Sequence, residues 1–207
     1  SVILTKYSIS FKIKNVLLEN VATFIPLALY THYGPISIYH MKHVAIHSSN
    51  FTNSGGCLGG VLLLKDVKLI NLAYSQFSNN SAMLGGGAVF IENVESVNFV
   101  ANLFQFNAAN DSGGAVSFTN VKLIKIFETH ILANKAVHNG GGLYFEDFNQ
   151  AYLINIQAAH NSLRKYGGSI SCYSGSIAVI INSILYDNHA TDSGGAIDIT
   201  FSGKFVS

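Results

Sequence analysis

The sequence predicts an all-β fold, a parallel β-helix in which about seven coils of ~27 residues stack on one another. Asparagine recurs at one fixed spacing, at Asn53, Asn80, Asn107, Asn134, Asn161 and Asn188. A glycine pair ends seven residues after each asparagine, with its second member at Gly60, Gly87, Gly114, Gly141, Gly168 and Gly195. Apolar residues alternate with a period of two in register with both signals, and a fixed period of this size indicates one structural unit repeated along an axis.

The first strand of each coil is predicted directly after the glycine pair. Apolar columns stand two and four residues beyond it, for example at Leu62 and Leu64 or at Val116 and Phe118. This alternation is typical of a strand with one buried face. Glycine before the strand permits positive φ and lets stacked backbones approach closely.

A corner and two further strands complete the predicted coil. The corner column is polar and turn-prone, at Asp66, Asn93, Asn120, Asp147 and Ser174. Asn and Asp tolerate the left-handed conformation that a sharp corner needs. A second strand follows, and then a third inward column at Phe77, Phe104, Ile131, Ala158 and Leu185. Each strand is expected to pair in parallel with its copy in the next coil.

The asparagine column is predicted to be structural rather than ligand-binding. A side-chain amide carries both a donor and an acceptor, so identical asparagines stacked one coil apart can form a hydrogen-bonded ladder.

The regular repeats are predicted over residues 34–207 as one continuous domain, with one or more irregular coils over residues 1–33. The apolar run Val21–Tyr30 is about half as long as a membrane span and contains Pro26, so no membrane span is predicted. Neither end shows the polar cap that a solenoid needs, so we expect a segment of a longer polypeptide or ends covered by partner chains.

Composition narrows the classes of partner. Apolar residues make up 49% of the chain, charged residues 11%, and the net charge is +1 with Arg164 as the single arginine. Nucleic acid is therefore not expected as a partner. Cys57 and Cys172 lie four periods and seven residues apart, roughly 19 Å along the axis, against the ~6 Å that a disulfide tolerates. Two free thiols are expected.

Two motifs carry a resemblance to known proteins. G-G-A-[VI] occurs at Gly86–Val89, Gly113–Val116 and Gly194–Ile197, and F-x-x-N occurs at Phe77–Asn80 and Phe104–Asn107. The chain thereby resembles the chlamydial polymorphic outer-membrane proteins and similar surface proteins of bacteria and protists. The resemblance implies a right-handed parallel β-helix and an extracellular or surface-exposed adhesin or structural stalk.

A leucine-rich repeat is the alternative fold. Its period can also be about 27 residues, and Val94–Asn102 fits its consensus. The asparagine of that consensus is replaced elsewhere, by Ser75, Thr129, Ile156 and Ser183.

Catalytic chemistry finds little support in the residues. The best candidates for catalytic acids are Asp66, Glu92, Glu146 and Asp147. Glu92 and Glu146 are expected two coils apart, about 10 Å. This separation is long for the carboxyl pair of a retaining glycosidase and marginal for that of an inverting one. The cluster His40, His43 and His47 has helical spacing in a region predicted as strand and corner. No catalytic residue, metal site or cofactor is predicted.

The interpretation is a non-enzymatic extracellular or surface module that contacts other chains, copies of itself, or glycans. Candidate outward contacts are Tyr144, Tyr152, Tyr173 and Tyr186, and three sequons permit N-glycosylation at Asn50, Asn79 and Asn110. The alternative function is a polysaccharide lyase or hydrolase built on the same fold.

Overall fold

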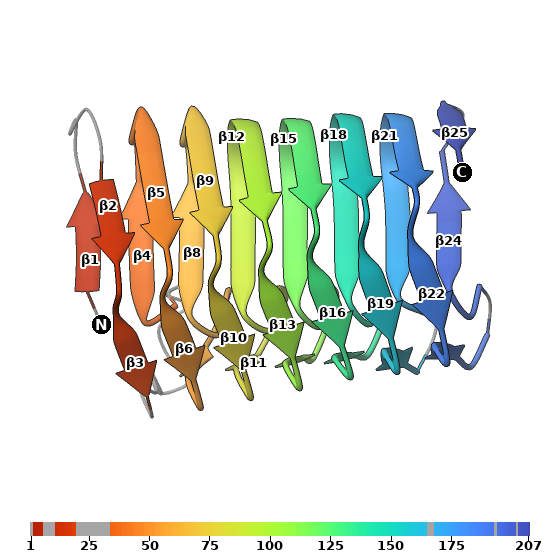
Figure 1. The fold of residues 1–207 in the computed structure, drawn as a ribbon, viewed down its shortest axis with the longest axis horizontal. Coiled ribbons are helices and arrows are strands. Elements are labelled where there is room, and N and C mark those ends of the chain that lie inside the picture. The colour runs from red at the N-terminus through yellow and green to blue at the C-terminus, as the bar shows by residue number, and fades with distance from the viewer. Residues whose placement is uncertain (1, 6–10, 20–33, 165–167, 193, 202) are drawn as a thin grey trace.

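The computed structural model describes residues 2–5, 11–19, 34–164, 168–192, 194–201 and 203–207. Within these ranges the chain consists of strands joined by bends and irregular connections, with no helix. Its strands run side by side along one axis from the N-terminal to the C-terminal end (Figure 1). Every strand pairing is parallel and joins equivalent segments of neighbouring coils, as between β12 (Val89–Val100) and β15 (Val116–Phe127). The predicted all-β parallel solenoid is confirmed, and the hand of its coil stays a prediction.

The strands of the described residues form three sheets of twelve, seven and six members. The twelve-stranded sheet contains β1 (Val2–Thr5), β2 (Phe11–Lys14), β4 (Ile36–Tyr39), β5 (His43–His47), β8 (Leu62–Lys65), β9 (Leu69–Ala73), β12, β15, β18 (Leu143–Ile154), β21 (Ile170–Ile181), β24 (Ile197–Thr200) and β25 (Lys204–Val206). Three parallel sheets differ from the leucine-rich repeat alternative, in which each repeat contributes one strand and a helix or 3₁₀ segment.

The two smaller sheets close the coil. The seven-stranded sheet contains β3 (Leu17–Glu19), β6 (Asn50–Thr52), β10 (Gln76–Ser78), β13 (Leu103–Gln105), β16 (His130–Leu132), β19 (Gln157–Ala159) and β22 (Ile184–Tyr186). The six-stranded sheet contains β7 (Gly55–Gly56), β11 (Ser81–Ala82), β14 (Ala108–Ala109), β17 (Lys135–Ala136), β20 (Ser162–Leu163) and β23 (His189–Ala190). Parallel strands need no crossover helix here, because the rest of each coil is the connection.

The first two predicted strands merge in the central coils. β12, β15, β18 and β21 each run for twelve residues and bend at one left-handed residue, at Asn93, Asn120, Asp147 and Ser174. These four residues have φ between 52° and 58°. A single left-handed residue turns the chain without interrupting the ladders on either side, so the predicted corner is a bend within one strand.

The coil between β4 and β8 is one residue shorter than the coils that follow it. Ile36 pairs with Leu62, and Leu62 pairs with Val89. The sequence spacing from Ile36 to Leu62 is therefore one residue shorter than the spacing from Leu62 to Val89. The assignment of Asn53 to the buried asparagine column is therefore wrong. Asn53 lies at an exposed corner with φ 51°, and Ser54 occupies the column position, where its backbone N–H donates to Asn80 Oδ1.

The segment before Gly34 contributes strands to the same sheets. β1 pairs with β4, with Val2 opposite Ile36, and β3 pairs with β6, with Leu17 opposite Asn50. The first coil is thus longer than the others. The predicted irregular segment Val21–Tyr30 lies outside the described residues. In the part of the chain that the structure describes, no helix has the length and hydropathy to cross a membrane.

The core is filled by columns of stacked aromatic and aliphatic side chains. Phe51, Phe77 and Phe104 stack with ring centroids 4.8 Å and 4.9 Å apart, and Phe118 stacks on Phe145 at 4.9 Å. All five rings are fully buried. Because each coil places the same column one strand spacing further on, the aromatic faces meet in offset stacks that add to the burial of apolar area.

Candidate functional site

The buried asparagine column joins successive coils by both main chain and side chain. Asn107 Oδ1 accepts hydrogen bonds from the backbone N–H and the Nδ2 group of Asn80, at 3.1 Å and 3.0 Å. Asn107 Nδ2 donates to Phe77 O and to Asn134 Oδ1, at 3.0 Å and 2.9 Å. The same pattern continues through Asn161 to Asn188. These amides use their donors and acceptors inside the protein, so the column offers them to no ligand.

A second polar column stands at the corner before the seven-stranded sheet. It contains Ser49, Ser75, Asn102, Thr129 and Ser183, each of which accepts a backbone N–H from the preceding coil. The serine and threonine hydroxyls also donate to the carbonyl two residues earlier in their own coil. Sequence reasoning found this repeat position only as a degenerate leucine-rich-repeat consensus and missed its hydrogen-bonding role, because its members share only an acceptor atom and Ile156 interrupts it.

The glycine pairs lie where neighbouring coils approach most closely. The first member has positive φ at Gly59, Gly86, Gly113, Gly140 and Gly194. A Cβ atom on the second member, at Gly60, Gly87, Gly114, Gly141 or Gly168, would overlap the carbonyl oxygen of the equivalent glycine one coil further on. Gly195 differs, because its nearest neighbour would be Asn188 O at 3.4 Å.

Two aromatic residues occupy left-handed corner positions. Tyr74 has φ 52° and is 60% exposed, and Phe106 has φ 55° and is 57% exposed. Equivalent positions in some coils hold asparagine, which tolerates this conformation, as at Asn155 and Asn79, and in others hold residues such as Glu128 and Ala133 that do not favour it. A left-handed conformation costs a side-chain-bearing residue roughly 1–2 kcal/mol, and neither ring gains full burial in return.

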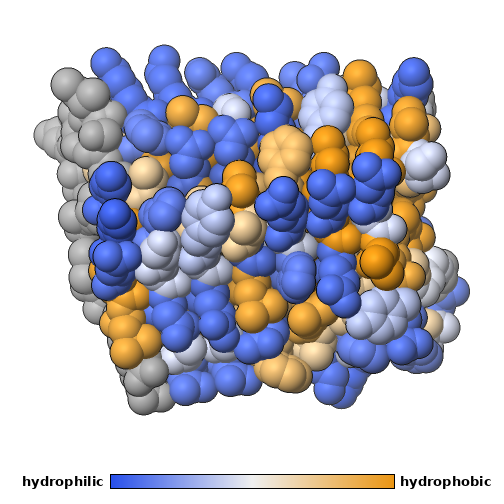
Figure 2. All heavy atoms as spheres, in the orientation of Figure 1, coloured by the Kyte–Doolittle hydropathy of each residue, from blue (hydrophilic) through white to orange (hydrophobic). Residues whose placement is uncertain are grey.

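The outer face of the seven-stranded sheet carries no charged side chain from β6 to β22. The residues that alternate with its inward column are Asn50, Thr52, Gln76, Ser78, Leu103, Gln105, His130, Leu132, Gln157, Ala159, Ile184 and Tyr186, of which Ser78 and Ala159 are buried. Hydrophilic and hydrophobic side chains are interspersed over the face that includes this sheet, and the hydrophobic ones gather toward the C-terminal end (Figure 2). The twelve-stranded sheet, by contrast, carries outward lysines and acids, including Lys65, Glu92, Lys125 and Glu146.

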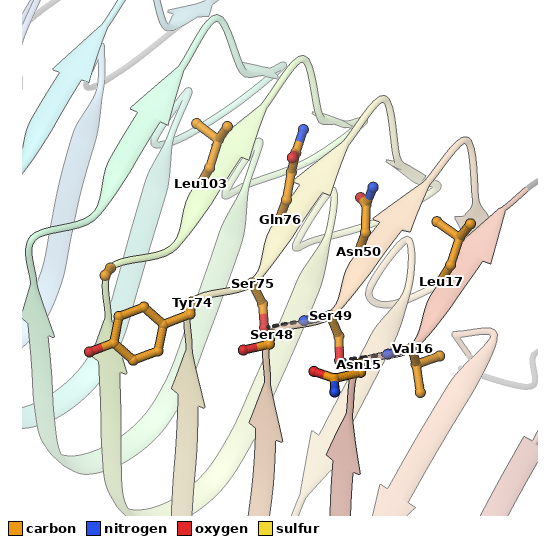
Figure 3. A pocket seen from close by; sticks show the side chains of 11 residues that line it. Asn15, Val16, Leu17, Ser48, Ser49, Asn50, Tyr74, Ser75, Gln76 and Leu103 are labelled. Atoms are coloured by element: carbon orange, nitrogen blue, oxygen red, sulfur yellow. Dashed lines mark hydrogen bonds between the residues drawn. The ribbon is translucent and has the colours of Figure 1, made fainter.

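A shallow groove of about 700 Å³ runs along one edge of this neutral face. It is lined by residues of four successive coils, from Asn15 to Leu103. Leu17, Asn50, Gln76 and Leu103 project side by side from successive strands, while the ring of Tyr74 extends from the neighbouring corner (Figure 3). The Tyr74 ring packs against His47 with centroids 5.1 Å apart.

One polar atom in the groove has no internal partner. Asn50 Oδ1 is buried and accepts no hydrogen bond from the described residues. A buried acceptor without a donor costs about 1–3 kcal/mol, and a ligand donor reaches this oxygen only if the Asn50 side chain turns toward the groove.

The acids proposed for catalysis are not assembled into a pair. Glu92 and Glu146 lie on the same outward column with Thr119 between them. Lys65 Nζ binds both carboxylate oxygens of Glu92 at 3.0 Å. Burial, followed by the nearby charges of Asp147 and Asp111, raises the pKa of Glu146.

The remaining predicted acids lie at corners. Asp66 Oδ1 accepts a hydrogen bond from Asn93 Nδ2 at 3.0 Å, and Asp66 Oδ2 lies 3.4 Å from His40 Nδ1. Asp147 is the exposed left-handed residue of β18. Among the described residues, no group of three or more histidine, cysteine or acidic side chains has metal-binding geometry.

The predicted outward tyrosines are spread over two sheets. Tyr144 and Tyr152 are partly buried on β18, and Tyr173 is exposed on β21. Tyr186 belongs to the seven-stranded sheet, where its hydroxyl accepts a hydrogen bond from Gln157 Nε2 at 3.0 Å. The structure therefore does not bring the four together. Tyr74 and Phe106 were missed, because backbone φ cannot be read from residue type.

The three sequons differ in exposure. Asn79 and Asn110 are exposed at corners, whereas Asn50 is partly buried in β6 next to the fully buried Phe51. Glycosylation at these sites stays a prediction, and Asn79 and Asn110 offer the more accessible acceptors.

The two cysteines are free thiols. Cys172 is buried on β21, and burial raises its pKa to about 12. Cys57 is partly exposed, and burial raises its pKa as well.

Comparison with known proteins agrees with the repeat architecture. The family description "Chlamydia polymorphic membrane protein (Chlamydia_PMP) repeat" matches residues 74–92, which span β10, β11, the glycine pair and the start of β12. Neither curated proteins nor solved structures give a match. The matched segment contains both motifs noted in the sequence, Phe77–Asn80 and Gly86–Val89. The chain is thus a parallel β-helix repeat protein similar to the chlamydial polymorphic membrane proteins.

Proposed function

We propose that the chain is a non-catalytic structural or adhesive module displayed outside the cell or at its surface. Its coils form a rigid scaffold in one continuous domain, and its outward faces contact other protein chains, further copies, or glycans. The observation that carries this proposal is the match of residues 74–92 to a repeat of membrane proteins, on a chain whose described coils stack in the same three parallel sheets. A stack of hydrogen-bonded coils suits a stalk, because each coil stabilises its neighbours.

The internal hydrogen bonding supports a load-resistant scaffold. Asn80, Asn107, Asn134 and Asn161 are at most 1% exposed, and each bonds to the next coil through both backbone and side chain. Buried, fully satisfied polar networks rigidify a structure and fix its register. Such a network keeps outward side chains at constant spacing, which a contact surface requires.

The catalytic alternative has weaker support. Hydrolysis of a glycosidic bond typically uses two carboxyl groups at a defined separation, and here Glu92 is paired with Lys65 and separated from Glu146 by Thr119. Incubation with uronate polymers tests the alternative. Depolymerisation that is lost in Glu92→Gln or Asp147→Asn would overturn the non-catalytic proposal.

Surface display is tested on intact cells of the native source. An antibody raised against the folded chain should label unpermeabilised cells, and external protease should remove the label while a cytosolic marker stays intact. Labelling that requires permeabilisation would contradict the proposal.

Assembly is tested separately with purified chain. Sedimentation analysis over increasing concentration should show association, in line with the small number of charges at the surface. A single monomeric species at the highest concentration would restrict the partners to other molecules.

A further inference from the structure

We propose that the groove beside Tyr74 and the neutral outer face of the seven-stranded sheet bind an extended, uncharged glycan chain, with Tyr74 and Phe106 as aromatic contacts. This inference rests on the proposed function and names the ligand class and the surface that would serve it.

Tyr74 and Phe106 are large aromatic residues at left-handed corner positions. Position 74 belongs to a column that also holds Ser48, Ala101, Glu128, Asn155 and Asn182, and position 106 to a column that also holds Asn53, Asn79, Ala133, His160 and Asp187. Asparagine, aspartate and serine satisfy this backbone geometry in several coils, whereas alanine, glutamate and histidine share the left-handed strain in others. Tyr74 and Phe106 place large aromatic rings at these strained positions and expose more than half of their surface. Residues that work against stability while exposed are candidates for binding.

The polar side chains that line the groove are uncharged. The groove displays the amides of Asn15, Asn50 and Gln76 and the hydroxyl of Ser48, with no charged residue among the side chains that line it. Side-chain amides both donate and accept hydrogen bonds, as sugar hydroxyls do. Asn50 Oδ1 is unpartnered but buried, so it accepts such a hydroxyl once the side chain turns toward the groove. An uncharged, hydroxyl-rich ligand therefore fits this surface better than an ionic one.

The groove presents equivalent positions of successive coils. The groove crosses four coils along the solenoid axis, and equivalent positions recur at Leu17, Asn50, Gln76 and Leu103. Neighbouring strands lie ~4.8 Å apart, close to the length of one pyranose unit in an extended chain. Successive sugars of a polymer would thus meet successive coils in register.

The aromatic contact is held in place before any ligand binds. Tyr74 packs on His47, whose Nδ1 atom lies 2.6 Å from Ser48 Oγ. A ring fixed by its neighbours loses little conformational freedom on binding, which favours affinity. The alternative occupant is a second copy of this chain, but Asn50 and Gln76 separate the apolar Leu17 from Leu103, so the groove offers no continuous apolar strip.

The test is titration calorimetry of the purified chain with cellohexaose and chitohexaose, with oligogalacturonate of the same length as the charged comparison. The variants are Tyr74→Asn and Phe106→Asn, each of which installs the residue found elsewhere in the same column. Ala133→Asn is the matched control, because it changes the Phe106 column one coil away and outside the groove.

A neutral hexasaccharide should bind the wild type in preference to the charged one. Tyr74→Asn should lower affinity by about tenfold or more, and Phe106→Asn should lower it less, because Phe106 does not line the groove. Both variants should melt at or above the wild-type temperature, because relief of the strained corner favours folding. Ala133→Asn should leave affinity unchanged.

Several results would overturn the proposal. It fails if neither neutral hexasaccharide binds the folded chain, or if Tyr74→Asn binds as tightly as wild type. If the wild type self-associates and the Tyr74→Asn variant is monomeric, the groove is a contact between copies of the chain and the glycan proposal is wrong. A large fall in the melting temperature of Tyr74→Asn would show that Tyr74 is structural. None of these outcomes bears on surface labelling of cells, so the inference can fail while the proposed function stands.

Discussion

Asn107 and Asn134 lie one coil apart and are joined twice, because Asn134 Oδ1 accepts both the backbone N–H of Asn107 at 3.0 Å and its Nδ2 group at 2.9 Å. The side chain therefore substitutes for a backbone carbonyl and carries the hydrogen-bonded ladder around a corner where no sheet exists. Asn134 is completely buried, and its own Nδ2 group donates to Phe104 O and Asn161 Oδ1.

Asn134→Asp should destabilise the fold by about 3–5 kcal/mol near neutral pH, since a carboxylate oxygen would then face two acceptors, Phe104 O and Asn161 Oδ1. The buried carboxyl would have its pKa raised above its unfolded value of about 3.9. The native state then binds more protons than the unfolded state in the interval between those pKa values, so stability falls as pH rises through it.

Urea unfolding at several pH values measures this effect. The deficit should shrink at acid pH, where the protonated carboxyl can donate a hydrogen bond. Asn53→Asp is the control, because Asn53 is exposed at a left-handed corner that aspartate also tolerates, and it should change stability by no more than about 0.5 kcal/mol. Equal losses of stability in Asn134→Asp and Asn53→Asp would contradict the placement of Asn53 outside the buried asparagine column.

Gly114→Ala should destabilise the chain by about 3 kcal/mol or more, lowering its melting temperature by roughly 6–12 °C. The added Cβ would overlap Gly141 O and would lie 2.6 Å from the carbonyl carbon of Lys135, both backbone atoms that cannot move independently. Calorimetric melting compares it with Gly195→Ala, whose Cβ would lie 3.4 Å from Asn188 O. Similar melting temperatures for the two variants would show that coils do not approach closely at the second glycine.

Glu146→Gln should raise the melting temperature near neutral pH. Burial, with Asp147 and Asp111, raises the pKa of Glu146, so folding favours its protonated form and stability falls as pH rises above the unfolded value near 4.5. The glutamine variant removes that penalty, and its advantage should vanish at acid pH where Glu146 is protonated. Glu92→Gln, which removes the ion pair with Lys65, should give no such gain. A pH-independent difference between wild type and Glu146→Gln would contradict this assignment.

Cys57 should react with a thiol reagent in the folded protein, while Cys172 should remain protected until the chain unfolds. Cys172 is 3% exposed with its pKa raised to about 12, whereas Cys57 is only partly buried. Reactivity depends on both access and thiolate content. Mass mapping after timed alkylation measures the two rates, and faster labelling of Cys172 would contradict its buried placement.

The fixed period of the sequence predicted the parallel solenoid because apolar alternation, corners and glycine pairs share one register. It did not reveal the shorter coil, in which Asn53 lies one full period before Asn80 by coincidence, at a corner that also favours asparagine. The available signal was the spacing from Phe51 to Phe77, which is one residue shorter than the spacing from Phe77 to Phe104. A period set by one residue type can thus conceal a single deletion.

The second polar column could not be predicted from identity. Ser75, Asn102 and Thr129 differ in shape and share only an acceptor atom within reach of the previous coil. The candidate groove was missed for another reason. It depends on the left-handed φ of Tyr74 and on the absence of charge across adjacent strands, a property of a surface that appears only when coils are stacked in register.

Hydrogen exchange of asparagine side-chain amides, followed by NMR on the intact chain, tests the central claim that the coils stack in parallel around a buried asparagine column. We predict that the Nδ2 protons of Asn80, Asn107, Asn134 and Asn161 exchange as slowly as the amides of the central strands, while those of Asn53 exchange freely with solvent. Rapid exchange of Asn107 and Asn134, or protection of Asn53 equal to theirs, would contradict it.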